Sequence, residues 1–166
     1  MLFAPCAVVH AQQPKKIPRI GYLTASSYAT ALSNTQAFSD GLRQMGYIEG
    51  KNIIVEWRFA EAQDQRLAKL AAELVALNVD VIVTASTPAI RVVQKATHTI
   101  PIIMANVGDP VAQGFVASLA RPGGNITGFT NVSPDVSTKR LELLKEAAPK
   151  TSRVAVYLMR RSTRRP

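Results

Sequence analysis

Short apolar runs alternate with amphipathic helical segments along most of the chain, and this alternation constrains the fold more than any other feature. The runs are mostly apolar throughout, as in residues 79–84 (VDVIVT) and 101–105 (PIIMA). Strands of this kind belong to parallel sheets that helices cover on both faces. The pattern therefore predicts an α/β fold built on a doubly wound parallel sheet.

The predicted elements follow one another with short connections and without an internal repeat. Apolar runs predict strands at 19–23, 53–57, 79–84, 101–105, 126–129 and 153–158. Helical spacing and capping residues predict helices at 38–45, 64–77, 87–96 and 137–148, the last with Leu141, Leu144 and Ala148 facing inward. Asp109-Pro110 resembles a helix cap followed by a first-turn proline, which predicts one more helix start.

Three loops stand out because ligands of doubly wound sheets bind beyond the carboxyl ends of the strands. They are residues 24–28 (TASSY), 85–88 (ASTP) and 106–110 (NVGDP), and all are rich in small and polar side chains. Two of them run into predicted helix N-termini, where free N–H groups and the helix dipole favour an anion. Ser, Thr and Asp also cap helices for stability alone, so both roles stay open from spacing.

Motifs of enzyme chemistry are missing from these loops. No G-x-G-x-x-G follows the first strand, and no P-loop or G-x-S-x-G motif occurs. His10 and His98 have no partners at catalytic or metal-binding spacing, and Cys6 is the only cysteine. We therefore expect a binding protein and not an enzyme, with no catalytic residue, no metal site and no cofactor.

Residues 1–11 are apolar and uncharged and end in Val9-His10-Ala11 before a polar stretch. Val9 and Ala11 would be the small residues at positions −3 and −1 of a signal-peptidase site. We therefore predict a partial signal peptide at residues 1–11 and export to the periplasm. The alternative is a frayed N-terminus of a cytosolic protein.

The net charge of +9 invites a nucleic-acid partner, but its distribution argues against one. Four arginines, at positions 160, 161, 164 and 165, lie in the last seven residues, and the other 16 basic residues exceed the 11 acidic ones by only five. We expect residues 159–166 to be a disordered Arg-rich tail at a truncated or frameshifted end, and we predict no nucleic-acid binding. A basic interaction arm is the alternative.

Several stretches together resemble the bacterial ABC-transporter substrate-binding proteins of the family that includes tryptophan- and tyrosine-type binding proteins. The specific motifs are G-Y-x-E-G-x-N-I at 46–53, T-P-A at 87–89, G-D-P-V at 108–111 and L-A-R-P-G-G-N-I-T-G at 119–128. The resemblance extends from about residue 18 to residue 158.

This resemblance implies two Rossmann-like lobes of the type I periplasmic binding protein kind, with the ligand in the cleft between them. Residues 18–130 would form the first lobe, and residues 131–158 a crossover helix and the first strand of a second lobe that is otherwise largely missing. The implied function is the solute-binding component of an ABC importer, which binds an amino acid or small carboxylate and delivers it to a membrane permease. A ligand-sensing domain of the same fold and a soluble α/β enzyme are the alternatives.

The resemblance also implies which residues line the pocket of the first lobe. Ser86 and Thr87 would hold a ligand carboxylate at their helix N-terminus, Asn106 and Asp109 would take polar or ammonium groups, and Tyr28 would stack on a ring. The complete expected set is Ser26, Ser27, Tyr28, Ser86, Thr87, Asn106 and Asp109.

Overall fold

The computed structural model describes residues 16–132 and 134–153. The chain divides into two compact units that meet between Asn131 and Val132. The first unit contains a sheet with its covering helices, and the described part of the second contains one helix. Within the described ranges, no helix has the length and apolar character that crossing a bilayer requires.

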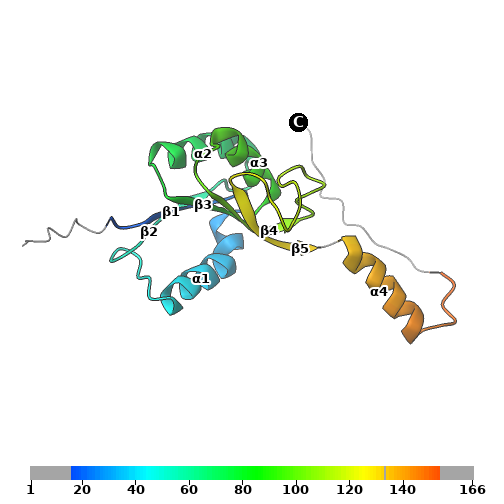
Figure 1. The fold of residues 1–166 in the computed structure, drawn as a ribbon. Coiled ribbons are helices and arrows are strands. Elements are labelled where there is room, and N and C mark those ends of the chain that lie inside the picture. The colour runs from blue at the N-terminus through cyan, green and yellow to red at the C-terminus, as the bar shows by residue number, and fades with distance from the viewer. Residues whose placement is uncertain (1–15, 133, 154–166) are drawn as a thin grey trace, which may run out of the picture. The chain divides into compact units, whose positions relative to one another are not determined.

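The first unit alternates strands and helices in the predicted order as far as residue 108 (Figure 1). Its elements are β1 (Arg19–Thr24), α1 (Tyr28–Gln44), β2 (Ile54–Phe59), the 3₁₀ turn η1 (Asp64–Arg66), α2 (Leu67–Ala76), β3 (Val81–Thr84), α3 (Thr87–Ala96), β4 (Ile102–Gly108) and β5 (Ile126–Val132). The strands form one sheet in the order β2-β1-β3-β4-β5.

The strands run parallel, so their carboxyl ends lie along one edge of the sheet. Ile20 in β1 pairs with Val55 in β2 and with Val81 in β3, and β3 pairs with β4 in the same direction. The Ile102 N–H donates to the Asn125 carbonyl (2.7 Å), and the Thr130 hydroxyl donates to the Val107 carbonyl (2.9 Å), which aligns β5 with β4. The predicted α/β class with a doubly wound parallel sheet is confirmed.

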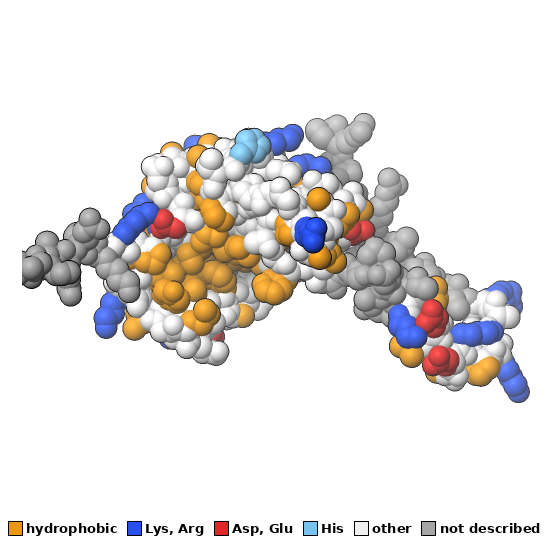
Figure 2. All heavy atoms as spheres, in the orientation of Figure 1, with side chains coloured by type: hydrophobic (Ala, Val, Ile, Leu, Met, Phe, Trp, Pro, Cys, Tyr) orange, Lys and Arg blue, Asp and Glu red, His pale blue; other side chains and the backbone are white. Residues whose placement is uncertain are grey.

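Two apolar layers hold helices on opposite faces of this sheet, as the alternation of side chains along each strand requires. In Figure 1, α2 and α3 lie on one face and α1 on the other. The first layer contains Leu23, Leu74, Ile82, Ile90 and Val93, and the second contains Ile20, Tyr22, Val55 and Val83 with Phe38 and Trp57 packed against them. Apolar side chains also gather on the surface around the position of α1 (Figure 2).

The prediction of a helix after Asp109 was wrong, because residues 110–114 form turns. Asp109 closes the first of these turns instead, since its Oδ1 accepts the Ala112 N–H at 3.0 Å. The Phe115 N–H then donates to the Pro110 carbonyl (2.9 Å), and Gly114 has a φ of +71°. The chain reverses here because Phe115, which is 5% exposed, is buried in the first apolar layer.

The second unit contains α4 (Pro134–Ala147), where a helix at 137–148 was predicted. The inward orientation expected for Leu141 and Leu144 is not seen, because these side chains are 52% and 39% exposed. The predicted signal peptide (1–11), all but the first residue of the predicted strand at 153–158, and the Arg-rich tail (159–166) lie outside the described residues. The lobe boundaries therefore stay predictions.

Gly128 in β5 has no room for a side chain. Its φ is +140°, and a Cβ atom there would lie within 3.0 Å of the backbone nitrogen, carbonyl carbon and oxygen of Met104. We expect Gly128→Ala to lower the free energy of unfolding by about 2 kcal/mol or more, because both strands must shift. Urea unfolding followed by fluorescence of the single tryptophan, Trp57, measures this change.

The matched control is Gly124→Ala, since a Cβ at Gly124 meets nothing within 4 Å. An equal loss of stability in the two variants would contradict the close approach of β5 to β4 at Gly128.

Candidate functional site

The candidate site lies where the strand order reverses, at the carboxyl ends of β1 and β3. From β1 the chain first adds β2 on one side and then returns to place β3 on the other side. The loops after β1 and β3 therefore lead to helices on opposite faces of the sheet. Folds of this class usually bind their ligand between two such loops, and we call this position the crevice. Ser26, Ser27, Ser86 and Thr87 all belong to these two connections.

A hydrogen bond from one loop to the other joins them directly. The Ala25 N–H donates to Ser86 Oγ at 3.2 Å. Ser86 is the N-cap residue of α3, but its side chain makes no capping bond to the helix. Pro88, at the second position of α3, has no N–H to offer. The N–H groups of Thr87 and Ala89 therefore receive no cap from Ser86, and the positive end of the helix dipole faces this edge.

The N-terminus of α1 lies beside the same crevice but is occupied by acceptors of the protein itself. Ser27 Oγ accepts the Thr30 N–H at 3.3 Å, and Glu61 Oε1 accepts the Tyr28 N–H at 3.1 Å. Of the two helix N-termini at the crevice, α3 is thus the one left for an anionic group of a ligand.

Thr84, the last residue of β3, was not among the residues predicted from sequence. Its side chain is fully buried, and Oγ1 has no hydrogen-bond partner among the described residues. Such a hydroxyl is rare in proteins and costs roughly 1–3 kcal/mol of stability. Because Thr84 lies two positions before Ser86, we add it to the candidate residues. Only its burial reveals it, and no sequence motif would have done so.

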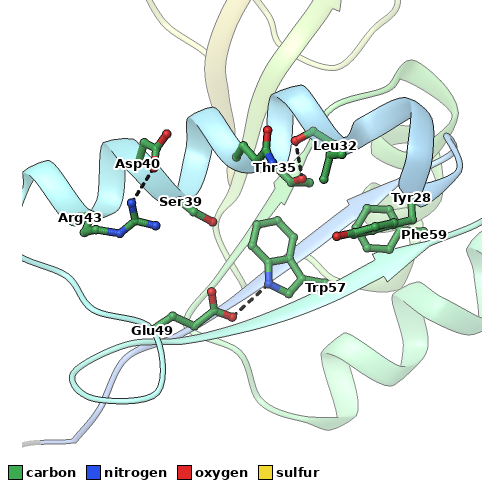
Figure 3. A pocket seen from close by; sticks show the side chains of 10 residues that line it. Tyr28, Leu32, Thr35, Ser39, Asp40, Arg43, Glu49, Trp57 and Phe59 are labelled. Carbon is green, nitrogen blue, oxygen red and sulfur yellow. Dashed lines mark hydrogen bonds and ion pairs between the residues drawn. The ribbon is translucent and has the colours of Figure 1, made fainter.

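Tyr28 begins α1 and is available for stacking, since it is 57% exposed. Its ring meets that of Phe59 edge to face, with centroids 5.4 Å apart. Both residues lie at one end of a groove of about 600 Å³ between α1 and β2. Figure 3 shows Trp57 in the middle of this groove, with its Nε1 donating to Glu49 at 3.0 Å. Neither Ser86 nor Thr87 lines the groove.

The remaining predicted residues are less closely associated with the crevice. Ser26 is half-buried, and its N–H donates to Thr24 Oγ1 (3.3 Å). Asp109 follows β4, one strand further from the reversal point, and its Oδ1 is engaged with the Ala112 N–H. The side chain of Asn106 lies outside the described part of the structure. Among the described residues, no group of three or more His, Cys, Asp or Glu side chains is placed to hold a metal ion.

The unpartnered hydroxyl of Thr84 makes a testable contrast with Thr97. Thr97 is also buried, but its Oγ1 accepts the N–H groups of Thr99 and Ile100 at 3.3 and 3.1 Å. We expect Thr97→Val to lower the free energy of unfolding by roughly 1–3 kcal/mol, because two N–H groups lose their acceptor. Thr84→Val should leave it unchanged or raise it, since a methyl group replaces a buried hydroxyl that has no partner.

Thermal unfolding of the ligand-free variants measures the difference. A destabilisation of Thr84→Val as large as that of Thr97→Val would show that the Thr84 hydroxyl is satisfied within the protein.

Comparisons with known proteins give one consistent result. Residues 19–161 match the family model described as "ABC transporter substrate binding protein". A tyrosine-binding protein from Clostridioides difficile is 34% identical over 143 residues, which are 86% of this chain and 41% of that protein.

Solved structures with similar folds include a conserved domain protein from Vibrio cholerae (32% identity, TM-score 0.70, 81% of this chain and 45% of that chain). A ligand-free, open substrate-binding protein with adhesive properties from Clostridium difficile gives the same values. An ABC domain from Streptococcus pneumoniae in complex with L-Trp is 30% identical with a TM-score of 0.69, over 81% of this chain and 44% of that chain. The chain spans less than half the length of each relative.

Proposed function

This chain belongs to the ABC transporter substrate-binding protein family, and we propose that it forms one ligand-binding lobe of an importer component for an amino acid with an aromatic side chain. The observation that carries this proposal is the N-terminus of α3, which opens uncapped onto the crevice between the loops of β1 and β3. A site of this kind suits a carboxylate, which every amino acid carries.

The carboxylate would bind the N–H groups of Thr87 and Ala89 and the hydroxyl of Thr87. Ser86 fixes the neighbouring β1 loop through the Ala25 N–H, so Ser26 and Ser27 border the same crevice. Thr84 precedes Ser86 by two residues, and its buried hydroxyl has no hydrogen-bond partner among the described residues. This hydroxyl would bind the ligand once the loops adjust to it. Asn106 and Asp109, which follow the next strand, would contact further polar groups of the ligand.

The aromatic preference is supported by Tyr28 and by the relatives. Tyr28 presents an exposed ring, braced against Phe59, beside the β1 loop. Aromatic rings pack favourably on such a surface in offset or edge-to-face arrangements. One relative is named a tyrosine-binding protein, and another was solved with L-Trp.

In the proposed role the protein acts outside the cytoplasm and passes its ligand to a membrane permease. A second lobe would close over the carboxyl edge of the sheet, bury the ligand and exclude water. One lobe alone offers half of such a cleft, so we expect its affinity to be weak.

Chemical-shift mapping tests the proposal at weak affinity. On titration of the ¹⁵N-labelled chain with L-tryptophan or L-tyrosine, we expect the largest shifts at the amides of Ala25, Ser26, Ser86, Thr87 and Ala89. Thr87→Pro should abolish these shifts, because it removes an N–H and a hydroxyl at a first-turn position that tolerates proline.

The matched control is Ser33→Ala, which removes a hydroxyl from an exposed position on α1 and should leave the titration unchanged. Shifts that cluster away from the carboxyl edge, or none with either amino acid, would contradict the proposed function.

A further inference from the structure

The carboxylate of Glu61 lies in a segment that the predicted site does not include. Residues 60–63 follow β2 and lie against the loop after β1. The Ala60 N–H donates to the Thr24 carbonyl (3.0 Å), and the Ala62 N–H donates to the Ala25 carbonyl (2.8 Å). The β1 loop is therefore held on one side by Ser86 and on the other by this segment.

The backbone of this segment is unusual at two consecutive positions. Glu61 and Ala62 have φ values of 55° and 58°, although neither is a glycine. Left-handed conformations of ordinary residues are uncommon and persist where surrounding contacts impose them, often at binding sites. In this conformation the Glu61 carboxylate accepts the Tyr28 N–H, directly after the loop that follows β1.

The Glu61 carboxylate keeps most of its binding capacity. Oε1 accepts one N–H at 3.1 Å, whereas a carboxylate offers about four acceptor positions. The residue is exposed, and within the described part of the chain no basic side chain forms an ion pair with it. Asp109, the acid expected from sequence to take this role, is only half-exposed and follows β4, one strand further from the point where the strand order reverses.

On this basis we propose that Glu61 binds the ammonium group of the ligand, while the N-terminus of α3 binds its carboxylate. The inference rests on the proposed function and adds the residue that selects amino acids over other carboxylates. The ammonium and carboxylate groups of one amino acid would thus bind on opposite sides of the loop that follows β1.

The spacing of the sheet is compatible with this arrangement. β2 and β3 both flank β1, so their axes lie about 10 Å apart, which is twice the usual strand separation. The Glu61 carboxylate bonds to Tyr28 at the end of the loop that follows β1, the strand between them. An α-amino acid with one hydrogen bond of about 2.9 Å at each charged end spans roughly 8 Å.

Glu61→Gln tests the assignment because glutamine retains an oxygen that can accept the Tyr28 N–H while losing the charge. We expect the dissociation constant for L-tryptophan to rise about tenfold, as for loss of a charged hydrogen-bond partner. The dissociation constant for indole-3-propionate, which lacks the ammonium group, should stay within about twofold. Both are measured by NMR titration of the full chain.

Glu73→Gln is the control, because it also neutralises a hydrogen-bonded carboxylate (to Arg58 Nε, 3.1 Å) but lies on α2. The inference would be overturned if Glu61→Gln left the ratio of the two dissociation constants unchanged, whether neither constant rose or both rose equally. If the unsubstituted chain bound neither L-tryptophan nor L-tyrosine, the proposed function itself would fail, and the inference with it.

Discussion

The parallel pairing of β1 with both of its neighbours is the constraint on which the rest of the structure depends. Because Ile20 pairs with Val55 on one side and Val81 on the other, the loops after β1, β2 and β3 all emerge at the same edge. The chain reaches these neighbours in opposite directions across the sheet, so helices cover opposite faces and the loops after β1 and β3 flank the usual ligand position of such folds. The sheet thus brings together short polar segments that are up to about 60 residues apart in sequence.

Within that crevice, the difference between two helix N-termini determines the chemistry. Both helices begin with a serine as the N-cap residue, but the serines act differently. Ser27 caps its own helix, whereas Ser86 accepts an N–H from the neighbouring loop and leaves α3 uncapped. Glu61 adds a negative charge at the capped helix. The result is an edge with a positive helix end on one side and a carboxylate on the other, which is complementary to an amino acid in its charged form.

The sequence was sufficient to predict the sheet and the loops at its carboxyl edge, because apolar runs and helical spacing are local signals. It could not predict how each polar side chain is used. Ser86 and Asp109 both looked like helix caps, yet one bonds across strands and the other closes a turn, and the choice depends on burial of Phe115 and on strand order. Glu61 and Thr84 were not predicted from the sequence. Glu61 is notable for its backbone conformation and Thr84 for its buried hydroxyl, and no sequence motif encodes either feature.

A crystal structure of the chain with L-tryptophan tests the central claim most directly. We predict that the ligand carboxylate accepts hydrogen bonds from the N–H groups of Thr87 and Ala89, at the N-terminus of α3. L-tryptophan bound only in the groove between α1 and β2, without contact to α3, would contradict the account.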